Sequence, residues 1–240
     1  MIHIINIITA MAALLCGLRV NVGTSVSDSW TAGTVITADS AQVLCIRGDV
    51  FVATSISESI VQRMQGKSLP AGASVKTSDL RYLMLLHYNL RGEVCTGEMV
   101  CNKAIATDLI DIFKELYEAR YPIERMVLID DYDANDEASM EANNTSCFCY
   151  RAVNNGSGRL SAHSLGLAVD LNPLYNPCVR NRNGRQQVEP TNGIDYVDRI
   201  KSFPYKIDQN DLAYRLFTQH GFTWGGAWRS LKDYQHFEKK

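Results

Sequence analysis

The chain has 240 residues, of which 46% are hydrophobic and 21% are charged, and its formal net charge is -2. This length allows one large domain with an extensive hydrophobic core, or such a domain preceded by an N-terminal appendage. The near-neutral balance of charge gives no broad basic surface for nucleic acid or anionic membrane, so we expect no nucleic-acid partner.

The N-terminus carries an apolar run from Ile4 to Leu15. The run has the length of the apolar part of a signal peptide and is too short to span a membrane readily as a helix. No Lys or Arg precedes the run. It ends at Cys16, as at a lipoprotein cleavage site, although Leu15 is larger than the residue that such a site prefers. A buried helix or strand is the alternative. We predict a signal peptide or lipoprotein signal over residues 1–22, export to the periplasm or cell envelope, and membrane contact only through this segment.

Residues 23–74 are predicted to form an N-terminal arm of uncertain structure. Residues 21–40 are rich in Ser, Thr and Gly, which is typical of a linker. The apolar segment 41–52 predicts a short strand, and the segment 54–67, with hydrophobic residues near helical spacing, predicts a short helix. The apolar run 79–88 fits either a strand or a helix.

The clearest helix is predicted over residues 102–120. Its hydrophobic residues fall on one face, its acidic residues lie largely off that face, and Pro122 follows it. A second helix is expected over residues 211–220. Between the two, residues 134–146 form a polar loop of the kind that borders a functional cleft, and residues 147–151 alternate like a strand.

The chain has seven cysteines, and their spacing does not match that of a zinc finger. We expect buried thiols, with one or two disulfides if the compartment is oxidising. Cys95 and Cys101 could then close a short loop, and Cys147 or Cys149 could reach Cys178. The sequence leaves these pairings open.

The residues that carry chemistry lie in two separated segments. His163 and Asp170 stand seven positions apart among small and apolar residues, and His236 lies near the C-terminus in the pattern Asp233-x-x-His236. Imidazole nitrogens and a carboxylate oxygen suit Zn²⁺, and three protein ligands with a fourth position left to water are typical of a catalytic zinc site. A single His and Asp in one stretch are more often structural, so the prediction depends on His236.

Two further residues complete the predicted chemistry. Asp233, close to that water but not a ligand, would act as the general base and pass the proton to the leaving amine. Arg151 would donate to the developing oxyanion. Glu238 follows His236 by two positions and is the alternative base.

Two motifs carry a resemblance to a known family, namely Ser161-x-His163-x-x-Gly166-x-Ala168-x-Asp170 and the distal Asp233-x-x-His236. Together they resemble the M15 zinc peptidases, the group of D-alanyl-D-alanine carboxypeptidases and L-alanyl-D-glutamate endopeptidases. The segments 170–177 and 221–228 agree with this group in order, and the resemblance covers roughly residues 75–240. Some members have Glu where this chain has Asp233, and the first 70 or so residues have no counterpart in it.

Carried over by position, the resemblance implies one Zn²⁺ ion held by His163, Asp170 and His236, with Asp233 as the base and Arg151 as the oxyanion-stabilising residue. It also implies an α+β fold of the hedgehog/D,D-peptidase type, in which a small antiparallel sheet is packed with helices. The zinc peptidase domain would then span residues 75–240, after the signal segment 1–22 and the arm 23–74.

The activity that the resemblance implies is hydrolysis of peptidoglycan stem peptides by a monomeric zinc metallopeptidase, of the carboxypeptidase or the L-Ala-D-Glu endopeptidase type. The sequence does not say which bond is cut. The alternative is a zinc-bearing binding module of the same fold that has lost catalysis, although the presence of both Asp233 and Arg151 favours the enzyme.

Three residues are predicted to bind substrate: Ser161, Trp224 and Trp228. The two tryptophans fit equally well as core residues, since Gly225 and Gly226 between them allow either arrangement. Residues 175–205, which include four arginines, are read as a solvated insertion or as a segment that attracts acidic peptidoglycan stems.

Overall fold

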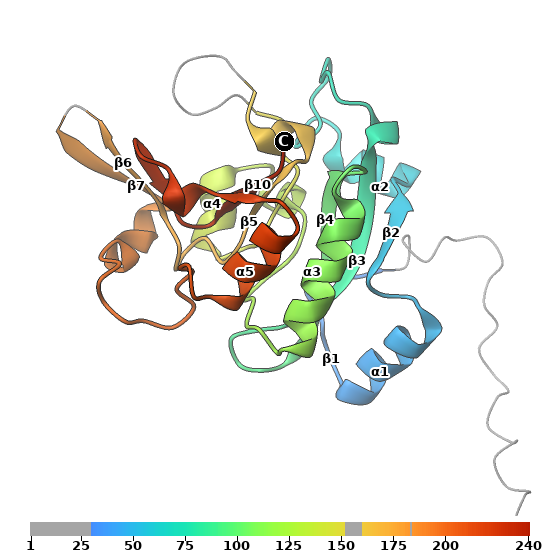
Figure 1. Ribbon diagram of the computed structural model, residues 1–240. Helices are drawn as coiled ribbons and strands as arrows, with labels where there is room; N and C mark the ends of the chain where they lie inside the picture. The colour runs from blue at the N-terminus through green and yellow to red at the C-terminus, as the bar shows by residue number, and fades with distance from the viewer. Residues whose placement is uncertain (1–29, 152–159, 183) are drawn as a thin grey trace, which may run out of the picture.

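A computed structural model describes residues 30–151, 160–182 and 184–240 of the chain. Helices and small antiparallel sheets are mixed in it, as the predicted α+β class requires (Figure 1). One part of the fold is a four-stranded sheet, and the other part contains two three-stranded sheets. The predicted signal segment, residues 1–22 with Cys16, lies outside the described residues.

The four-stranded sheet has the strand order β1-β4-β3-β2. Its central strands pair over their whole lengths, from Leu80 opposite Asn102 to Tyr88 opposite Val94, and nearly all of their residues are buried. This burial on both faces explains why the run 79–88 is apolar throughout. The strands of the sheet are β1 (Val35–Ile36), β2 (Val52–Ser55), β3 (Leu80–Tyr88) and β4 (Val94–Asn102).

Helix α3 (Ala106–Glu118) packs against this sheet and lies within the helix predicted over residues 102–120 (Figure 1). The hydrophobic face read from the sequence is the face that is buried. Its members are Ile105, Leu109, Ile112, Phe113 and Leu116.

The N-terminal part of the described chain belongs to the same sheet. Helix α1 (Ala38–Arg47) occupies most of the segment 41–52, for which a strand was expected, so that prediction is wrong. The reason is local, because Thr37 caps the first turn through its side chain and Gly48 ends the helix with a φ of 70°. Since β1 and β2 pair with β4 and β3, the predicted boundary at residue 75 passes between strands of one sheet.

Three phenylalanine rings join the two parts of the fold. Phe113 of α3 meets Phe217 of α5 (Leu212–Gln219) edge to face at a centroid distance of 6.2 Å, and Phe217 stacks on Phe237 at 4.3 Å. Phe237 is the middle residue of β10 (His236–Glu238) and is fully buried. Because neighbouring residues of a strand point to opposite faces, burial of Phe237 directs the side chain of His236 away from this core.

Short elements complete the fold. The two three-stranded sheets have the orders β5-β10-β8 and β7-β6-β9. Their remaining strands are β5 (Ala168–Asp170), β6 (Cys178–Arg182), β7 (Arg185–Glu189), β8 (Thr223–Trp224) and β9 (Leu231–Asp233). The remaining helices are α2 (Glu58–Met64), α4 (Asp136–Glu141) and the 3-10 helices η2 (Thr77–Asp79), η3 (Ile129–Tyr132), η4 (Ala162–Leu165), η5 (Thr191–Tyr196) and η6 (Gly225–Ala227).

Two further findings concern the whole of the described chain. Across the described residues, every helix falls short of the length and hydrophobicity that a membrane span needs. The cysteines of these residues are all free thiols, and all but Cys45 are buried. Neither of the disulfide arrangements considered from the sequence is therefore formed in this structure, because Cys95, Cys101 and Cys178 are among the free thiols.

Candidate metal centre and active site

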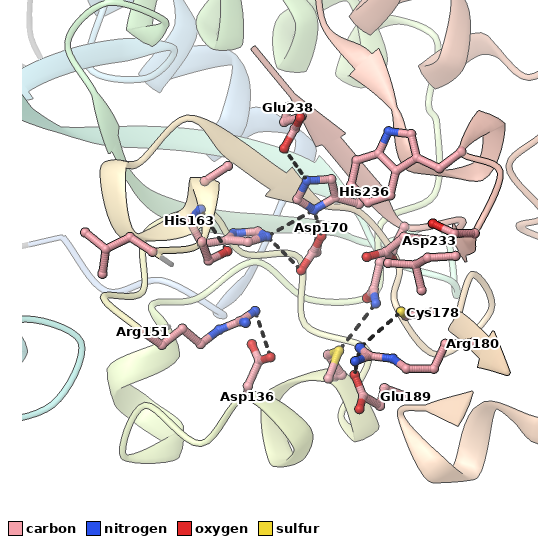
Figure 2. A pocket seen from close by; sticks show the side chains of 18 of the residues that line it. Asp136, Arg151, His163, Asp170, Cys178, Arg180, Glu189, Asp233, His236 and Glu238 are labelled. Atoms are coloured by element: carbon pink, nitrogen blue, oxygen red, sulfur yellow. Dashed lines mark hydrogen bonds and ion pairs between the residues drawn. The ribbon is translucent and has the colours of Figure 1, made fainter. Parts of the chain in front are cut away.

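His163, Asp170 and His236 converge on one point, although 73 residues separate the two histidines along the chain. His163 stands in η4, Asp170 ends β5, and the register of β5 with β10 places Asp170 opposite His236. His163 Nε2 lies 3.1 Å from Asp170 Oδ2, His236 Nδ1 lies 3.0 Å from Asp170 Oδ1, and the two nitrogens are 3.2 Å apart (Figure 2). All three residues are buried.

These separations fit a tetrahedral zinc site. With bonds of about 2.0–2.1 Å, adjacent ligand atoms around such an ion lie about 3.3 Å apart. Each imidazole also has a partner at its outer nitrogen, since His163 Nδ1 lies 2.6 Å from the Cys147 carbonyl oxygen and His236 Nε2 lies 3.4 Å from Glu238 Oε2. Acceptors at these positions fix the tautomer and leave the inner nitrogens as ligand atoms. The donor set therefore fits one zinc ion.

The electrostatics of the cluster also favour a cation. Burial alone would lower the pKa of His236, but hydrogen bonds to Asp170 and Glu238 raise this pKa to about 10. Burial alone would raise the pKa of Asp170, but the two histidines bring it well below its ordinary value. The two imidazoles thus flank an ionised Asp170 carboxylate, which stabilises positive charge beside it. A divalent metal ion would supply this charge while both imidazoles stay neutral.

The loop that carries His163 is held against the end of β4. Ser161 caps η4, and its Oγ accepts a hydrogen bond from His163 N at 3.3 Å. Gly166 ends η4 with a φ of 67°, and a Cβ there would lie 2.6 Å from Asn102 N. Asn102 donates from its backbone to Gly166 O at 2.8 Å and from its side chain to Leu165 O at 2.9 Å. Glycine is therefore required at position 166 for both its conformation and this close approach.

Asp233 lies beside the cluster, and Figure 2 shows it near His236. Its Oδ1 is buried and has no hydrogen-bond partner among the described residues. Burial raises the pKa of Asp233 to about 6, even though the charge of His236 opposes this shift. Gly225 packs tightly against the same residues, since a Cβ there would lie 2.6 Å from Asp233 O and 3.2 Å from His236 Cβ. A carboxylate with an open acceptor and a pKa near neutrality is suited to general-base work.

Arg151 faces the cluster from another side (Figure 2). Its Nη2 forms an ion pair with Asp136 Oδ2 at 2.8 Å. Asp136 begins α4, within the polar loop 134–146 that was expected to border a cleft. Ser164 accepts a hydrogen bond from Arg151 N at 2.8 Å and donates one to the Arg151 carbonyl oxygen. Helix α4 therefore holds the guanidinium of Arg151, and η4 holds its backbone.

These side chains open into one cavity of about 420 Å³. Its volume lies in the range of about 300–1,000 Å³ that is usual for small-ligand sites. One part of the wall is formed by Asp233 and by the metal cluster, the name used here for the candidate ligands His163, Asp170 and His236. The β7-β6-β9 sheet forms another part. The other charged residues of the lining are Asp136, Arg151, Arg180, Glu189, Glu238 and Lys240.

The predicted substrate residues separate in the structure. Ser161 and Trp228 line the cavity, and the Trp228 ring lies 5.2 Å from the imidazole of His236. Trp224 is buried outside the cavity, where its Nε1 donates to the Tyr234 carbonyl oxygen at 2.9 Å. Gly226 packs against the Trp224 ring, since a Cβ there would lie 2.2 Å from it. The structure thus places Trp224 in the core, which was the alternative reading of this residue.

Several residues of the site were not singled out from the sequence. Asp136 was covered only by the general expectation of a cleft at residues 134–146, and the Cys147 carbonyl belongs to a segment read as a strand. Residues 147–151 form no strand and instead make single backbone bonds, such as Cys149 N to His163 O at 3.2 Å. Arg180 is covered only as one of the four arginines of the segment 175–205, which is predicted to be a solvated insertion or to attract acidic peptidoglycan stems, and Glu189 of the same segment is not predicted.

The comparisons with known proteins concern the C-terminal part of the chain. A family model described as D-alanyl-D-alanine carboxypeptidase, Peptidase_M15_4, matches residues 155–239. No curated protein and no solved structure gives a significant match. The matched segment contains His163, Asp170, Asp233 and His236, and it begins after Arg151. Residues 155–239 are thus similar to the M15 peptidase family, in agreement with the resemblance carried by the motifs at residues 161–170 and 233–236.

Proposed function

We propose that this protein is a zinc-dependent peptidase that cleaves peptidoglycan stem peptides. The observation that carries the proposal is the convergence of His163, Asp170 and His236 in a cavity that also holds Asp233. The family match supports the peptidase class and a substrate from peptidoglycan. His163 Nε2, His236 Nδ1 and the Asp170 carboxylate would hold a single Zn²⁺ ion.

The acid-base part of the reaction falls to Asp233. When bound, zinc polarises a carbonyl group and lowers the pKa of a water molecule towards about 7. Asp233 accepts the proton of the attacking water at its Oδ1, for which the described part of the chain offers no hydrogen-bond partner, and later delivers it to the nitrogen of the leaving amine. Burial supports this role, because it raises the pKa of Asp233 to about 6 and so lets one group take and return a proton near neutral pH.

Arg151 supplies positive charge for the developing oxyanion. Its guanidinium is fixed by Asp136 at 2.8 Å, so it needs little reorganisation when charge develops on the substrate carbonyl. Glu238, the alternative base, is engaged with His236 Nε2 at 3.4 Å and supports the ligand. This engagement favours Asp233 as the base.

The wider setting is part of the same proposal. We assign the fold to the hedgehog/D,D-peptidase type, with a monomeric protein exported to the periplasm or cell envelope. The family match supports this fold type, and the apolar run from Ile4 to Leu15 supports export. A cell-wall substrate lies outside the cytoplasm, which agrees with the proposed export.

The test is digestion of purified sacculi with the zinc-loaded full-length chain, with and without a chelator. We expect chelator-sensitive release of amino groups, and mass spectrometry of the released muropeptides identifies the bond that is cut. Zinc binding without any chelator-sensitive release would reject the peptidase and favour a zinc-bearing binding module.

A further inference from the structure

A second cavity lies on the other side of strand β9 from the metal cluster. It is lined by Arg199, by residues 206–210 and by parts of the segments 224–227 and 232–234. Its volume of about 530 Å³ falls in the range of about 300–1,000 Å³ that is usual for small-ligand sites. The mechanism proposed above does not use this cavity.

Strand β9 separates the two cavities. Leu231 and Asp233 line the cavity of the metal cluster, whereas Lys232 lines the second cavity. This alternation is expected of a strand, since neighbouring side chains point to opposite faces. The alternation continues past the strand, because Tyr234 lines the second cavity and Gln235 lines the first. The second cavity is therefore a site of its own, with its own set of side chains.

The charge of the second cavity is positive. Among the described residues, its charged lining consists of three positive groups and one negative group, which gives a net charge of +2: Arg199, Lys206, Lys232 and Asp208. Asp208 is already engaged, because its Oδ1 accepts from Asn210 N at 2.9 Å and its Oδ2 lies 3.7 Å from Lys206 Nζ. The cavity therefore favours a ligand with negative charge.

Arg199 is a largely buried cation that is held by neutral groups. Its Nη1 donates to Tyr175 O at 2.9 Å, and its Nη2 donates to Ile207 O at 2.9 Å and to Asn176 Oδ1 at 3.0 Å. The guanidinium also lies over the Tyr234 ring, 4.3 Å from its centroid. Burial lowers the pKa of Arg199 to about 10, so the group stays charged at neutral pH at a cost in free energy. An anion in the cavity would offset this cost.

Lys232 offers open hydrogen-bond donors to a ligand. Its Nζ donates to Gly226 O at 3.1 Å and, within the part of the chain that the structure describes, forms no ion pair. An ammonium group has three N–H donors, so Lys232 can bind a ligand and keep this contact. Lys206 Nζ donates to Lys201 O at 3.2 Å and to Arg199 O at 3.4 Å, so it contributes mainly charge.

Apolar and aromatic side chains form another part of the wall. They include Ile207, Ala227, Trp224 and Tyr234, and the rings of the last two have centroids 6.0 Å apart. Apolar walls with a few convergent polar groups are typical of sites for small organic ligands. A phosphate monoester carries a charge of about −1.5 to −2 at pH 7, which matches the net charge of the lining better than one carboxylate does. Lysine binds phosphate as a point charge.

We infer that the second cavity binds a small phosphate monoester with a cyclic body, such as an aryl phosphate or a sugar phosphate. Lys232 donates to the phosphate group, and Arg199 and Lys206 stabilise its charge. The cyclic body packs against Tyr234 and Trp224. This binding site goes beyond the proposed peptidase function and does not depend on the metal cluster.

Calorimetry on the full-length chain tests the inference. The probes are phenyl phosphate and glucose 1-phosphate. Each is titrated into the zinc-loaded chain and into chain freed of zinc by a chelator and dialysis, because phosphate can also bind a zinc ion. We expect at least one of the two to bind with the same affinity in both states. Benzoate and inorganic phosphate, which lack the second charge and the cyclic body, should each bind about tenfold more weakly.

Variants of the lining locate the bound probe. Lys232→Gln should weaken its binding about 10- to 100-fold, as for the loss of a hydrogen bond to a charged group, and Lys206→Gln should also weaken it. Lys232→Arg keeps the charge and should keep most of the affinity. Lys201→Gln is the matched control, because Lys201 is 71% exposed and lies outside the lining, and it should bind as the wild type does.

Three results would overturn the inference: binding of neither monoester, binding that requires zinc, or wild-type affinity in both Lys232→Gln and Lys206→Gln. Inorganic phosphate that binds as tightly as the monoesters would also overturn it, because the apolar wall would then contribute nothing. None of these measurements involves hydrolysis of sacculi, so the result does not depend on the proposed peptidase function.

Discussion

The four-stranded sheet and the region around the metal cluster are held together by different physical means. In the sheet, β3 and β4 each pair over nine residues, and their side chains are buried and largely apolar. Around the cluster, the strands have two to five residues each. A long ladder spreads its stability over many equivalent bonds, whereas short strands depend on individual contacts.

Those individual contacts are mostly polar. Asn176 Nδ2 donates to Asn172 O at 3.1 Å and to Tyr205 O at 3.0 Å, and its Oδ1 accepts from Ile207 N at 2.8 Å. Arg199 Nη2 also donates to this oxygen, at 3.0 Å. A buried polar group costs free energy unless it is hydrogen-bonded, so such a network specifies one arrangement of irregular chain. We therefore expect substitutions in the sheet and its core to change stability, and substitutions near the cluster to change chemistry first.

The largest expected effect separates two residues of the metal region. Asp233→Ala should keep one zinc ion per chain and lose about 100- to 10,000-fold in kcat, because it removes the base and no ligand. His163→Ala should lose the zinc itself. Metal content by mass spectrometry and hydrolysis of muropeptides check both variants. Equal loss of zinc in the two would contradict the roles assigned here.

The second prediction concerns the contact that joins the two regions. Phe217→Ala should reduce the free energy of unfolding by about 3–5 kcal/mol, because Phe217 is fully buried and its ring meets those of Phe113 and Phe237. Urea denaturation measures the change. Ile200→Ala is the control, since Ile200 is 97% exposed. If both variants lost the same small amount, the phenylalanine contact would not couple the regions.

The third prediction uses a histidine buried within the sheet. His87 lies in β3, its Nδ1 donates to Ile123 O at 2.8 Å, and burial lowers its pKa to about 4, compared with about 6.5 when unfolded. Because the folded pKa is the lower one, stability is complete above pH 6.5 and falls as pH decreases towards 4, by about 3 kcal/mol in all.

The check is the difference in unfolding free energy between wild type and His87→Gln, measured from pH 7 to pH 4. Groups at the metal cluster titrate in both proteins and cancel in this difference. The wild type should lose more stability than the variant over this interval. Parallel curves would show that His87 does not titrate in the folded sheet.

The smallest effect compares two glycines, one in each region. Gly225→Ala should lower kcat by about tenfold, because its Cβ would lie 2.6 Å from Asp233 O and displace the base. Gly92 lies in the turn between β3 and β4 with a φ of 74°, and a Cβ there would meet no atom of residues 30–151, 160–182 and 184–240 within 4 Å. Gly92→Ala should cost about 1 kcal/mol of stability through its backbone conformation and leave kcat unchanged. A similar loss of kcat in Gly225→Ala and Gly92→Ala would contradict the expectation that substitutions in the sheet leave the chemistry unchanged.

The sequence predicts the sheet and its helix from local patterns, and it predicts the region around the metal cluster mainly through the family motifs. The buried face of α3 was predicted because a helix of this length repeats its pattern several times, as at Leu109, Ile112 and Leu116. The meeting of His163, Asp170 and His236 was anticipated through the family motifs, although their roles as ligands stay a prediction. Spacing alone carried no information on a contact across 73 residues.

Other features depended on contacts that leave little local pattern. The apolar segment 41–52 does not indicate helix α1, because the N-cap Thr37 lies before this segment and the helix ends at Gly48, inside it. The position of Trp224 depends on how closely η6 packs against its ring. Arg180 becomes part of the cavity only through the register of β6 with β9, which a strand's own sequence does not encode.

Strand β10 has only three residues, yet its two faces have different surroundings. Phe237 stacks in the core while His236 faces Asp170 across the strand pair. Fraying of this strand would therefore open the core and displace His236, a proposed metal ligand, in one event, so metal binding at this site would be linked to local unfolding. Bound zinc should slow hydrogen exchange at the amides of β5 and β10 and leave the exchange of β3 and β4 nearly unchanged. A bound metal ion would then stabilise the pairing of β10 with β5, in which β10 has only three residues.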